Sequence, residues 1–342
     1  MKKLPFFPKV IAALLIAGIL IASAAQTYRI SQHHQQSAIG QITGDNYLIH
    51  LDSEECQVNI QSKLQEKSLF EEQIDESQGK RIIHINSIPS HSVGEFPNQG
   101  NPNTIQEREW TFSIPLHPKI AEQTTGGQGF DTGVLFSGVS IDPFTGEFFI
   151  GSNGMSNREW NITTFSSLID LGLDCNNAHV QPTGKYHYHG TPSAYLQELG
   201  ADGSEMVKVG YAADGFPIYY KYGYNENGKL AAYESGYQLR KGKRSGDGKT
   251  APDGNFNGMY FNDYEYIATL SDLDACNGKW GKTPESQKEY HYIITDNFPS
   301  VPICFSGTPS QELHKHGGLF RGGNNHPPHS PKGRGHHHPH RH

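Results

Sequence analysis

The sequence is poor in several features that define common classes of protein. Charged residues make up only 18% of its 342 residues, too few for a chain that charge keeps unfolded. Four cysteines are too few for a small scaffold held together by disulfides. P-loop, dinucleotide-binding and nucleophile-elbow motifs are lacking as well. The chain is therefore expected to be globular and to fall outside the best-known enzyme signatures.

What the chain does contain favours β structure. Its 38 glycines and 20 prolines interrupt helices, and its 17 tyrosines and 17 phenylalanines favour strands. A mainly β domain is therefore expected over residues 47–312, with antiparallel, sandwich-like sheets and a few short helices. Alternating or short apolar runs predict strands over residues 47–51, 57–60, 81–86, 109–115, 133–141, 210–223 and 289–295.

Four further segments of this domain are less regular. Residues 164–171 and 192–199 are expected to form short helices, and residues 64–75 a loop or a short helix. Residues 241–257 are rich in Gly, Lys and Asp, which predicts a surface loop. Within it, Asp253-Gly254-Asn255 resembles the start of a calcium-binding loop, but the acidic residue of the twelfth position falls one place late, so a turn is the better interpretation.

The N-terminus has the pattern of a secretory signal peptide. Lys2, Lys3 and Lys9 precede an apolar run over residues 10–22, and Ala22-Ser23-Ala24 offers small residues to signal peptidase. The run is short for a bilayer, so residues 1–24 are predicted to be cleaved and residues 25–46 to form a polar leader; an uncleaved anchor is the alternative. The protein is expected to be exported, to the periplasm or outside the cell, with no membrane-spanning segment after cleavage.

Cleavage would also change the charge of the chain. It removes three of the 28 basic residues and none of the 35 acidic ones, which leaves a net charge of 25 − 35 = −10. An acidic body does not favour nucleic acid as a partner.

The last 30 residues differ from the rest. Residues 313–342 contain no acidic residue and nine of the 19 histidines, interleaved with Pro and Gly, which predicts a disordered tail. Flexible imidazoles bind Zn, Cu or Ni with little geometric control, so the tail is expected to capture metal; a solubilising tail is the alternative. Its densest part is His336, His337, His338, His340 and His342.

A second group of histidines lies in the body. In Tyr186-His187-Tyr188-His189, a strand would place the two imidazoles on one face and the two phenols on the other. Two imidazoles at this spacing can chelate one transition-metal ion, Cu or Zn. His179, one turn-like segment upstream, is a candidate third ligand. The alternative is a polar groove that binds no metal.

The same order of residues occurs again downstream. Leu173-Asp174-Cys175-Asn176 precedes Tyr186-His187-Tyr188, and Leu273-Asp274 with Cys276-Asn277 precedes Tyr290-His291-Tyr292. Either an internal duplication or chance in a Tyr-rich chain explains the pattern. If the two copies pack as partners, His291 is expected to approach His187 and His189, which would give three imidazoles and an open coordination position.

These segments resemble a known family. The run Tyr186-His187-Tyr188-His189-Gly190-Thr191-Pro192 is similar to the motif after which YHYH-domain proteins are named, and similar segments occur in order between about residues 56 and 309. The family is exported and largely uncharacterised, so the resemblance implies a compartment but no activity.

Two other residues are candidates for completing or orienting a metal site. Asp214 lies in the turn Asp214-Gly215-Phe216-Pro217, and His91 follows Pro89. For each, a local structural role is the competing interpretation.

Export predicts paired cysteines. Cys276 with Cys304 and Cys56 with Cys175 are plausible pairs, but four cysteines allow three connectivities and the sequence does not choose among them. Ligation of metal by cysteine is the alternative.

The leading hypothesis is an exported protein that binds Cu or Zn for buffering or delivery. A metal-dependent enzyme, either a hydrolase or a copper oxidase, is the second hypothesis. A module that binds glycans or another surface without metal is the third.

Overall fold

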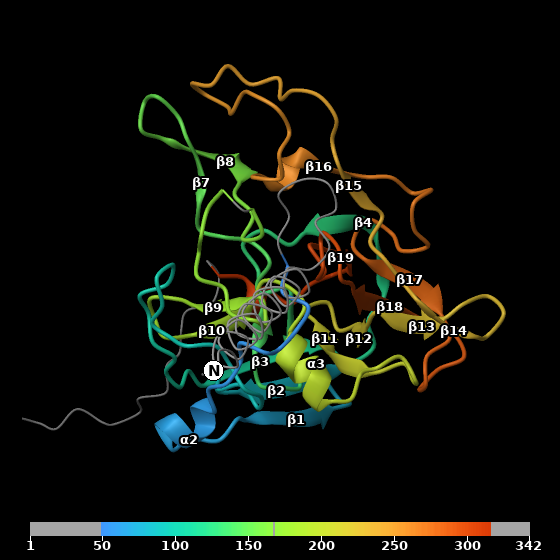
Figure 1. The fold of residues 1–342 in the computed structure, drawn as a ribbon. Coiled ribbons are helices and arrows are strands. Elements are labelled where there is room, and N and C mark those ends of the chain that lie inside the picture. The colour runs from blue at the N-terminus through green and yellow to red at the C-terminus, as the bar shows by residue number, and fades with distance from the viewer. Residues whose placement is uncertain (1–48, 167, 316–342) are drawn as a thin grey trace, which may run out of the picture.

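A computed structural model describes residues 49–166 and 168–315, and its centre is an eight-stranded sheet with the strand order β17–β18–β12–β11–β5–β6–β10–β9 (Figure 1). Most neighbours in it are antiparallel, but β10 pairs in parallel with β6, and β12 with β18. Its strands are β5 (Gly133–Leu135), β6 (Ser140–Ile141), β9 (Ala178–Val180), β10 (Tyr186–Tyr188), β11 (Lys208–Ala212), β12 (Pro217–Tyr220), β17 (Gly278–Gly281) and β18 (Glu289–Ile294).

Smaller sheets surround the large one. A three-stranded antiparallel sheet is formed by β1 (Phe70–Asp75), β2 (Lys80–Ile85) and β3 (Trp110–Pro115). The remaining strands form pairs: β4 (Ile120–Gly126) with β19 (Cys304–Gly307), β7 (Phe148–Ile150) with β8 (Ser156–Asn161), β13 (Tyr222–Tyr224) with β14 (Leu230–Ala232), and β15 (Tyr237–Leu239) with β16 (Tyr264–Tyr266). The predicted class, mainly β with antiparallel sheets, is confirmed.

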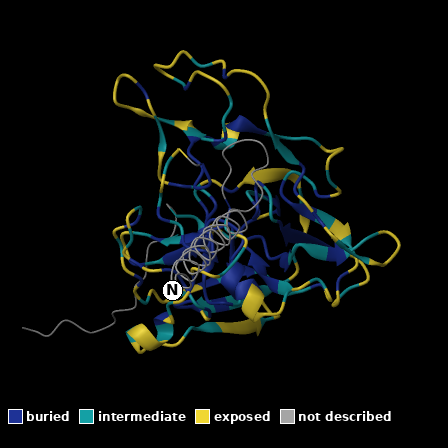
Figure 2. Cartoon of the chain, in the orientation of Figure 1, coloured by how far each residue is buried: buried dark blue, intermediate teal, exposed yellow. Residues whose placement is uncertain are grey.

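Alternation along the strands divides the large sheet into two faces. Tyr186 and Tyr188 of β10 and Tyr292 of β18 point into the largest apolar cluster and are fully buried. A second cluster joins the three-stranded sheet, through residues such as Ile83 and Phe112, to Val134 of β5. Buried segments gather in this layered region, whereas the loops around β7–β8 and β15–β16 are largely exposed (Figure 2). The aromatic content of the sequence is thus used mainly to build the core.

Helices are short, and one predicted helix is absent. The structure has α2 (Ile60–Leu64), α3 (Ser193–Glu198) and two 3₁₀ turns, η1 (Phe261–Asp263) and η2 (Gln311–Leu313). The helix expected over 192–199 is confirmed by α3. No helix forms over the described part of 164–171, where turns and an isolated bridge replace it.

Several predicted strands change character in the structure. The strand expected over 57–60 reduces to one bridge, Val58 with Val93, before α2 begins, and residues 49–51 form no strand. The region 64–75, expected to be a loop or a helix, ends in β1.

The four cysteines form two disulfides, Cys56–Cys175 and Cys276–Cys304. This is one of the three possible connectivities. One bridge joins Cys175, which precedes the first Tyr-His-Tyr segment, to Cys56, and the other joins Cys276 and Cys304, which flank the second. Ligation of a metal by cysteine is thereby excluded, since no free cysteine remains in the part of the chain that the structure describes.

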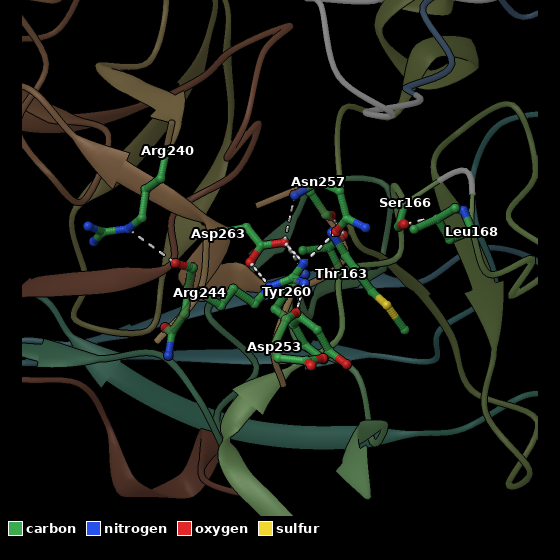
Figure 3. Close-up of polar contacts among 12 residues, drawn as sticks. Thr163, Ser166, Leu168, Arg240, Arg244, Asp253, Asn257, Tyr260 and Asp263 are labelled. Carbon is green, nitrogen blue, oxygen red and sulfur yellow. Dashed lines mark hydrogen bonds and ion pairs between the residues drawn. The ribbon is translucent and has the colours of Figure 1, made fainter. Parts of the chain in front are cut away.

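The segment 241–257 is a loop, as predicted, and a buried ion pair anchors it (Figure 3). The guanidinium of Arg244 donates from Nε to Oδ1 of Asp263 at 2.7 Å and from Nη2 to Oδ2 at 2.6 Å. It also donates to the backbone oxygen of Asp253 and to the side chain of Asn257. A guanidinium thus holds the residues that resemble a calcium loop, which agrees with their interpretation as a turn.

The folded body extends slightly beyond the predicted boundary at residue 313. Leu313 is buried, and the ammonium of Lys315 forms an ion pair with Asp142. Its limit therefore moves to at least residue 315. The predicted signal peptide, the leader and the remaining tail, including His336, His337, His338, His340 and His342, lie outside the described residues. Within the described ranges, no helix combines the length and the apolar character needed to cross a bilayer.

Candidate metal centre

Three histidines meet at one end of the large sheet. His187 is the central residue of β10, and His179 stands directly opposite it on the edge strand β9. His189 follows β10 by one residue, and its backbone N–H donates to the oxygen of Asn177 at 2.8 Å. Because side chains alternate along a strand, the two phenols of the Tyr-His-Tyr-His motif enter the core while the imidazoles share the other face.

The three rings are close enough to bind one ion. Each residue offers a ring nitrogen, and these atoms all lie within 4.8 Å of one another. The ring centres are 4.8 Å apart for His179 and His187, 4.5 Å for His179 and His189, and 4.7 Å for His187 and His189. Nε2 of His179 lies 3.0 Å from Nε2 of His189, near the separation of about 3.3 Å between two nitrogens on a tetrahedral zinc ion.

Backbone carbonyls fix the orientation of two of the rings. Nδ1 of His179 donates to the oxygen of Leu171 at 3.0 Å, and Nδ1 of His187 donates to the oxygen of Lys185 at 3.3 Å. Since a carbonyl only accepts, the proton of each neutral ring is on Nδ1. Nε2 then carries the lone pair that would bind a metal, as in many metal sites where the second nitrogen is hydrogen-bonded.

Burial keeps these imidazoles neutral. Desolvation lowers the pKa of His187 well below its usual range, and the neighbouring His189 and His179 lower it further. Desolvation likewise lowers the pKa of His189 well below its usual range, with a smaller contribution from His179. The pKa of His179 is lowered mainly by burial. Neutral imidazole is the form that binds metal ions, so the site is ready for an ion at neutral pH.

The three histidines line a cavity of about 780 Å³. The carboxylates of Asp142 and Glu147 and the cations Arg158 and Lys315 also line it. This volume is far larger than one ion requires and is within the range of small-molecule sites. An ion bound by the histidines could therefore contact a second molecule in the cavity.

Asp142 is the most unusual of the carboxylates in the cavity. It follows β6 directly, its N–H donates to the oxygen of Tyr188, and its carboxylate pairs with Lys315. Burial raises the pKa of Asp142 to about 6; Lys315 opposes this shift and Asp131 adds to it. A buried carboxyl with such a pKa can exchange a proton near neutral pH.

His291 does not join the three histidines, contrary to expectation. It lies on β18, and β12, β11, β5 and β6 separate that strand from β10 in the sheet. Its strand neighbour is Lys279 of β17, and its ring packs against Tyr219. The two Tyr-His-Tyr segments lie toward opposite ends of one sheet and are not packing partners.

His91 and Asp214 do not complete the site either. Nε2 of His91 lies 2.5 Å from the hydroxyl of Tyr188, on the core face of β10. The carboxylate of Asp214 accepts from the hydroxyl of Tyr292 at 2.6 Å and from the N–H of Gly307 at 2.9 Å. Both contacts are structural and lie away from the imidazole face of β10.

Sequence reasoning missed the polar residues of the cavity wall. Asp142 begins the segment Asp142-Pro143-Phe144-Thr145-Gly146, whose composition is typical of a turn and does not indicate that its carboxylate lies in the same cavity as the three histidines. Lys315 was assigned to the disordered tail. A polar residue directly after a buried strand is the one signal that could have identified Asp142.

The fold and the site define a mainly β protein with a histidine cluster at one end of its central sheet. The family model described as YHYH protein matches residues 111–307, more than half of the chain, and the protein therefore belongs to the YHYH family. Comparison with curated proteins and with solved structures gave no significant match. The family match includes every residue of the histidine cluster.

Proposed function

We propose that the protein binds one transition-metal ion, Cu or Zn, through His179, His187 and His189, and that it buffers or delivers this metal outside the cytoplasm. The observation that carries the proposal is the convergence of three neutral imidazoles, two of them buried and that of His179 half-buried, whose ring nitrogens lie within 4.8 Å of one another. Two intramolecular disulfides are consistent with export.

Three neutral imidazoles in contact suit one ion; without it, the N–H of one ring in the pair His179 and His189 would donate to the nitrogen of the other. Buried polar side chains are normally paired with groups of opposite hydrogen-bonding character. Here the nearest neighbour of His179 Nε2 is another imidazole nitrogen. An ion would receive both lone pairs and leave one coordination position open toward the cavity.

The tail would serve the same ion in a different way. It would collect metal without geometric selectivity, and the buried cluster would hold it selectively. Because the tail binds metal in any preparation, its eight histidines beyond Lys315 must be removed from the measurement. We define the tail-silent variant as the full-length chain with these eight residues changed to Gln: His316, His326, His329, His336, His337, His338, His340 and His342.

The test is elemental analysis of the tail-silent variant, purified without a metal column. We expect about one equivalent of Cu or Zn, and loss of this equivalent in the same variant with His187→Ala and His189→Ala. The matched control is His117→Ala, which removes an exposed imidazole outside the cluster. A folded tail-silent variant that carries no metal and takes up neither added Cu²⁺ nor Zn²⁺ would overturn the proposal and favour a metal-free binding module.

The cavity supports a second candidate, a metal-dependent hydrolase or copper oxidase. An open metal position facing about 780 Å³, with the buried carboxyl of Asp142 on the same wall, suits activation of water or binding of a substrate. Turnover on a panel of esters, peptides and phenols, abolished by His187→Ala and reduced by Asp142→Asn with metal still bound, would favour the enzyme. Metal binding without turnover on any of them would favour the buffering role.

A further inference from the structure

The large sheet repeats one arrangement of strands. Reading from one edge, the order is β9, β10, β6, β5; reading from the other edge, it is β17, β18, β12, β11. In each half the edge pair is antiparallel, the next pair is parallel and the third is antiparallel. The halves meet where β5 pairs antiparallel with β11. The two halves are thus related by an approximate twofold axis.

The same hydrogen bonds recur at matching positions. The hydroxyl of Tyr186 donates to Asp174 at 2.7 Å, and that of Tyr290 donates to Asp274 at 2.6 Å. A second pair of bonds joins the other tyrosine of each motif to the turn that precedes the parallel strand. There Tyr188 contacts the hydroxyl of Ser137 at 2.8 Å, and Tyr292 donates to Asp214 at 2.6 Å.

The turns match as well. Asn177 and Asn277 both have positive φ, 51° and 62°, and their carbonyls accept from the N–H of His189 and Ile293, both at 2.8 Å. Gly138 and Gly215 occupy equivalent turns with φ of 80° and 91°. A chance recurrence of Tyr-His-Tyr would not reproduce the register, the bonds and the turns together. The recurrence of Leu-Asp, Cys-Asn and Tyr-His-Tyr in the sequence is therefore an internal repeat.

The repeat assigns a counterpart to each histidine of the metal centre. His187 corresponds to His291, because each is the middle residue of its Tyr-His-Tyr strand. Register then pairs His179 with Lys279, since each faces that histidine across the edge pair. His189 corresponds to Ile293. The orientation of the shared histidine is preserved, because Nδ1 of His291 donates to the oxygen of Glu289 at 3.2 Å as that of His187 does to Lys185.

We propose that Lys279, His291 and Ile293 mark a second metal position, which keeps one of its three imidazoles. This inference rests on the proposed function of the first site. His291 is 1% exposed, and its Nε2 has no hydrogen-bond partner among the described residues. The ammonium of Lys279 lies 3.8 Å from the centre of the Tyr233 ring, and Ile293 packs with Tyr233 and Leu273. The ammonium of Lys279 and the side chain of Ile293 thus contact Tyr233, while Nε2 of His291 is left without a polar partner among the described residues.

The second position should accept Zn²⁺ or Cu²⁺ when its two missing imidazoles are restored. We would introduce Lys279→His and Ile293→His together into the tail-silent variant, and also into that variant with His187→Ala and His189→Ala. The probes are ZnCl₂ and CuCl₂ alone, followed by titration calorimetry and elemental analysis. We expect two equivalents in the first protein and one in the second, against one and none in the respective parents.

Controls separate the repeat from an accidental site. Trp280→His adds an imidazole to the same strand but on the opposite face of the sheet, so it should add no ion. Because Ile293→His disturbs a packed cluster, Lys279→His alone is the second variant. It restores only the cross-strand pair with His291 and should bind Cu²⁺ at least tenfold more tightly than the Trp280→His control.

The outcomes distinguish the two proposals. Added binding in both backgrounds supports the second position, even if the first site proves empty and the proposed function fails. Folded variants, judged by circular dichroism, that gain no ion in either background and show no difference from Trp280→His would overturn the second position.

Discussion

At the scale of single residues, His91 shows how burial in the core keeps an imidazole neutral. Its ring is buried against Tyr188, Tyr186 and Tyr195, and burial lowers its pKa from 6.5 to about 4. A neutral imidazole combines a flat ring with a nitrogen that can hydrogen-bond to a buried phenol. The residue is therefore a neutral part of the core and not a metal ligand.

This burial makes stability depend on pH in a defined direction. Above pH 6.5 His91 is neutral in both folded and unfolded states, and between pH 6.5 and 4 only the unfolded state takes up the proton. Acidification over this window therefore removes up to about 3 kcal/mol of folding free energy. In His91→Gln this loss is absent, so the stability difference between wild type and variant should narrow by about that amount from pH 7 to pH 4 in urea titrations.

The exposed His117 provides the control for this measurement. The control variant is His117→Gln, which removes an imidazole whose side chain is 72% exposed and lies outside the core. A His91→Gln profile that runs parallel to the wild type would contradict the argument.

The residues of the histidine cluster differ in how far the sequence could predict them. Alternation alone identified His187 and His189, since a strand is the one conformation that places both on a single face. His179 followed from its place in the preceding segment. The prediction for His291 was wrong because it took the similarity of the two Tyr-His-Tyr segments as a sign of contact. Similar segments of a repeat occupy equivalent positions, and in this sheet the equivalent strands β10 and β18 lie far apart.

At the scale of the elements, the buried ion pair of Arg244 and Asp263 stabilises the conformation of the loop 241–257. The side chains are 5% and 0% exposed, and the guanidinium of Arg244 makes four bonds, two to Asp263 of η1 and two within the loop. Such a pair is costly to break because the remaining charge stays buried.

Arg244→Met should therefore lower the free energy of unfolding by about 3–5 kcal/mol, measured by urea denaturation. Arg240→Met is the matched control, since Arg240 pairs with Glu265 at 3.4 Å on a half-exposed surface and should cost less than about 1 kcal/mol. Equal effects of the two substitutions would show that the buried pair does not anchor the loop.

Secondary structure followed the sequence where one face of a strand is buried. The strands β2 and β3 were predicted within one residue because their alternation reports a more buried and a less buried face. The strand β18 was predicted equally well, although all its residues after Glu289 are buried. The prediction of a helix over 164–171 was wrong because apolar residues of this segment make separate contacts with distant parts of the chain. Phe165, for example, packs against Gly190. Local periodicity cannot distinguish these cases, since the partners lie far along the chain.

For the whole molecule, the two disulfides constrain very different lengths of chain. Cys56–Cys175 closes a loop of 119 residues and Cys276–Cys304 one of 28. In the loop-entropy account a longer loop restricts the unfolded chain more, giving about 5 and about 3.5 kcal/mol.

Replacing Cys56 and Cys175 by Ala should therefore destabilise the protein more than replacing Cys276 and Cys304. Thermal unfolding of the two double variants under the same oxidising conditions measures the difference. The reverse order would show that native-state packing around the bridges outweighs the entropy of the unfolded chain.

The ion pair of Lys315 with Asp142 has a consequence for the proposed binding of a metal. It fixes the last described residue on the wall of the cavity, and the sequence continues from there with eight histidines. A covalently tethered donor meets its acceptor at a concentration set by the length of the tether and not by the amount of protein. The rate at which an ion exchanges between the tail and the cluster of one molecule would then be independent of the protein concentration.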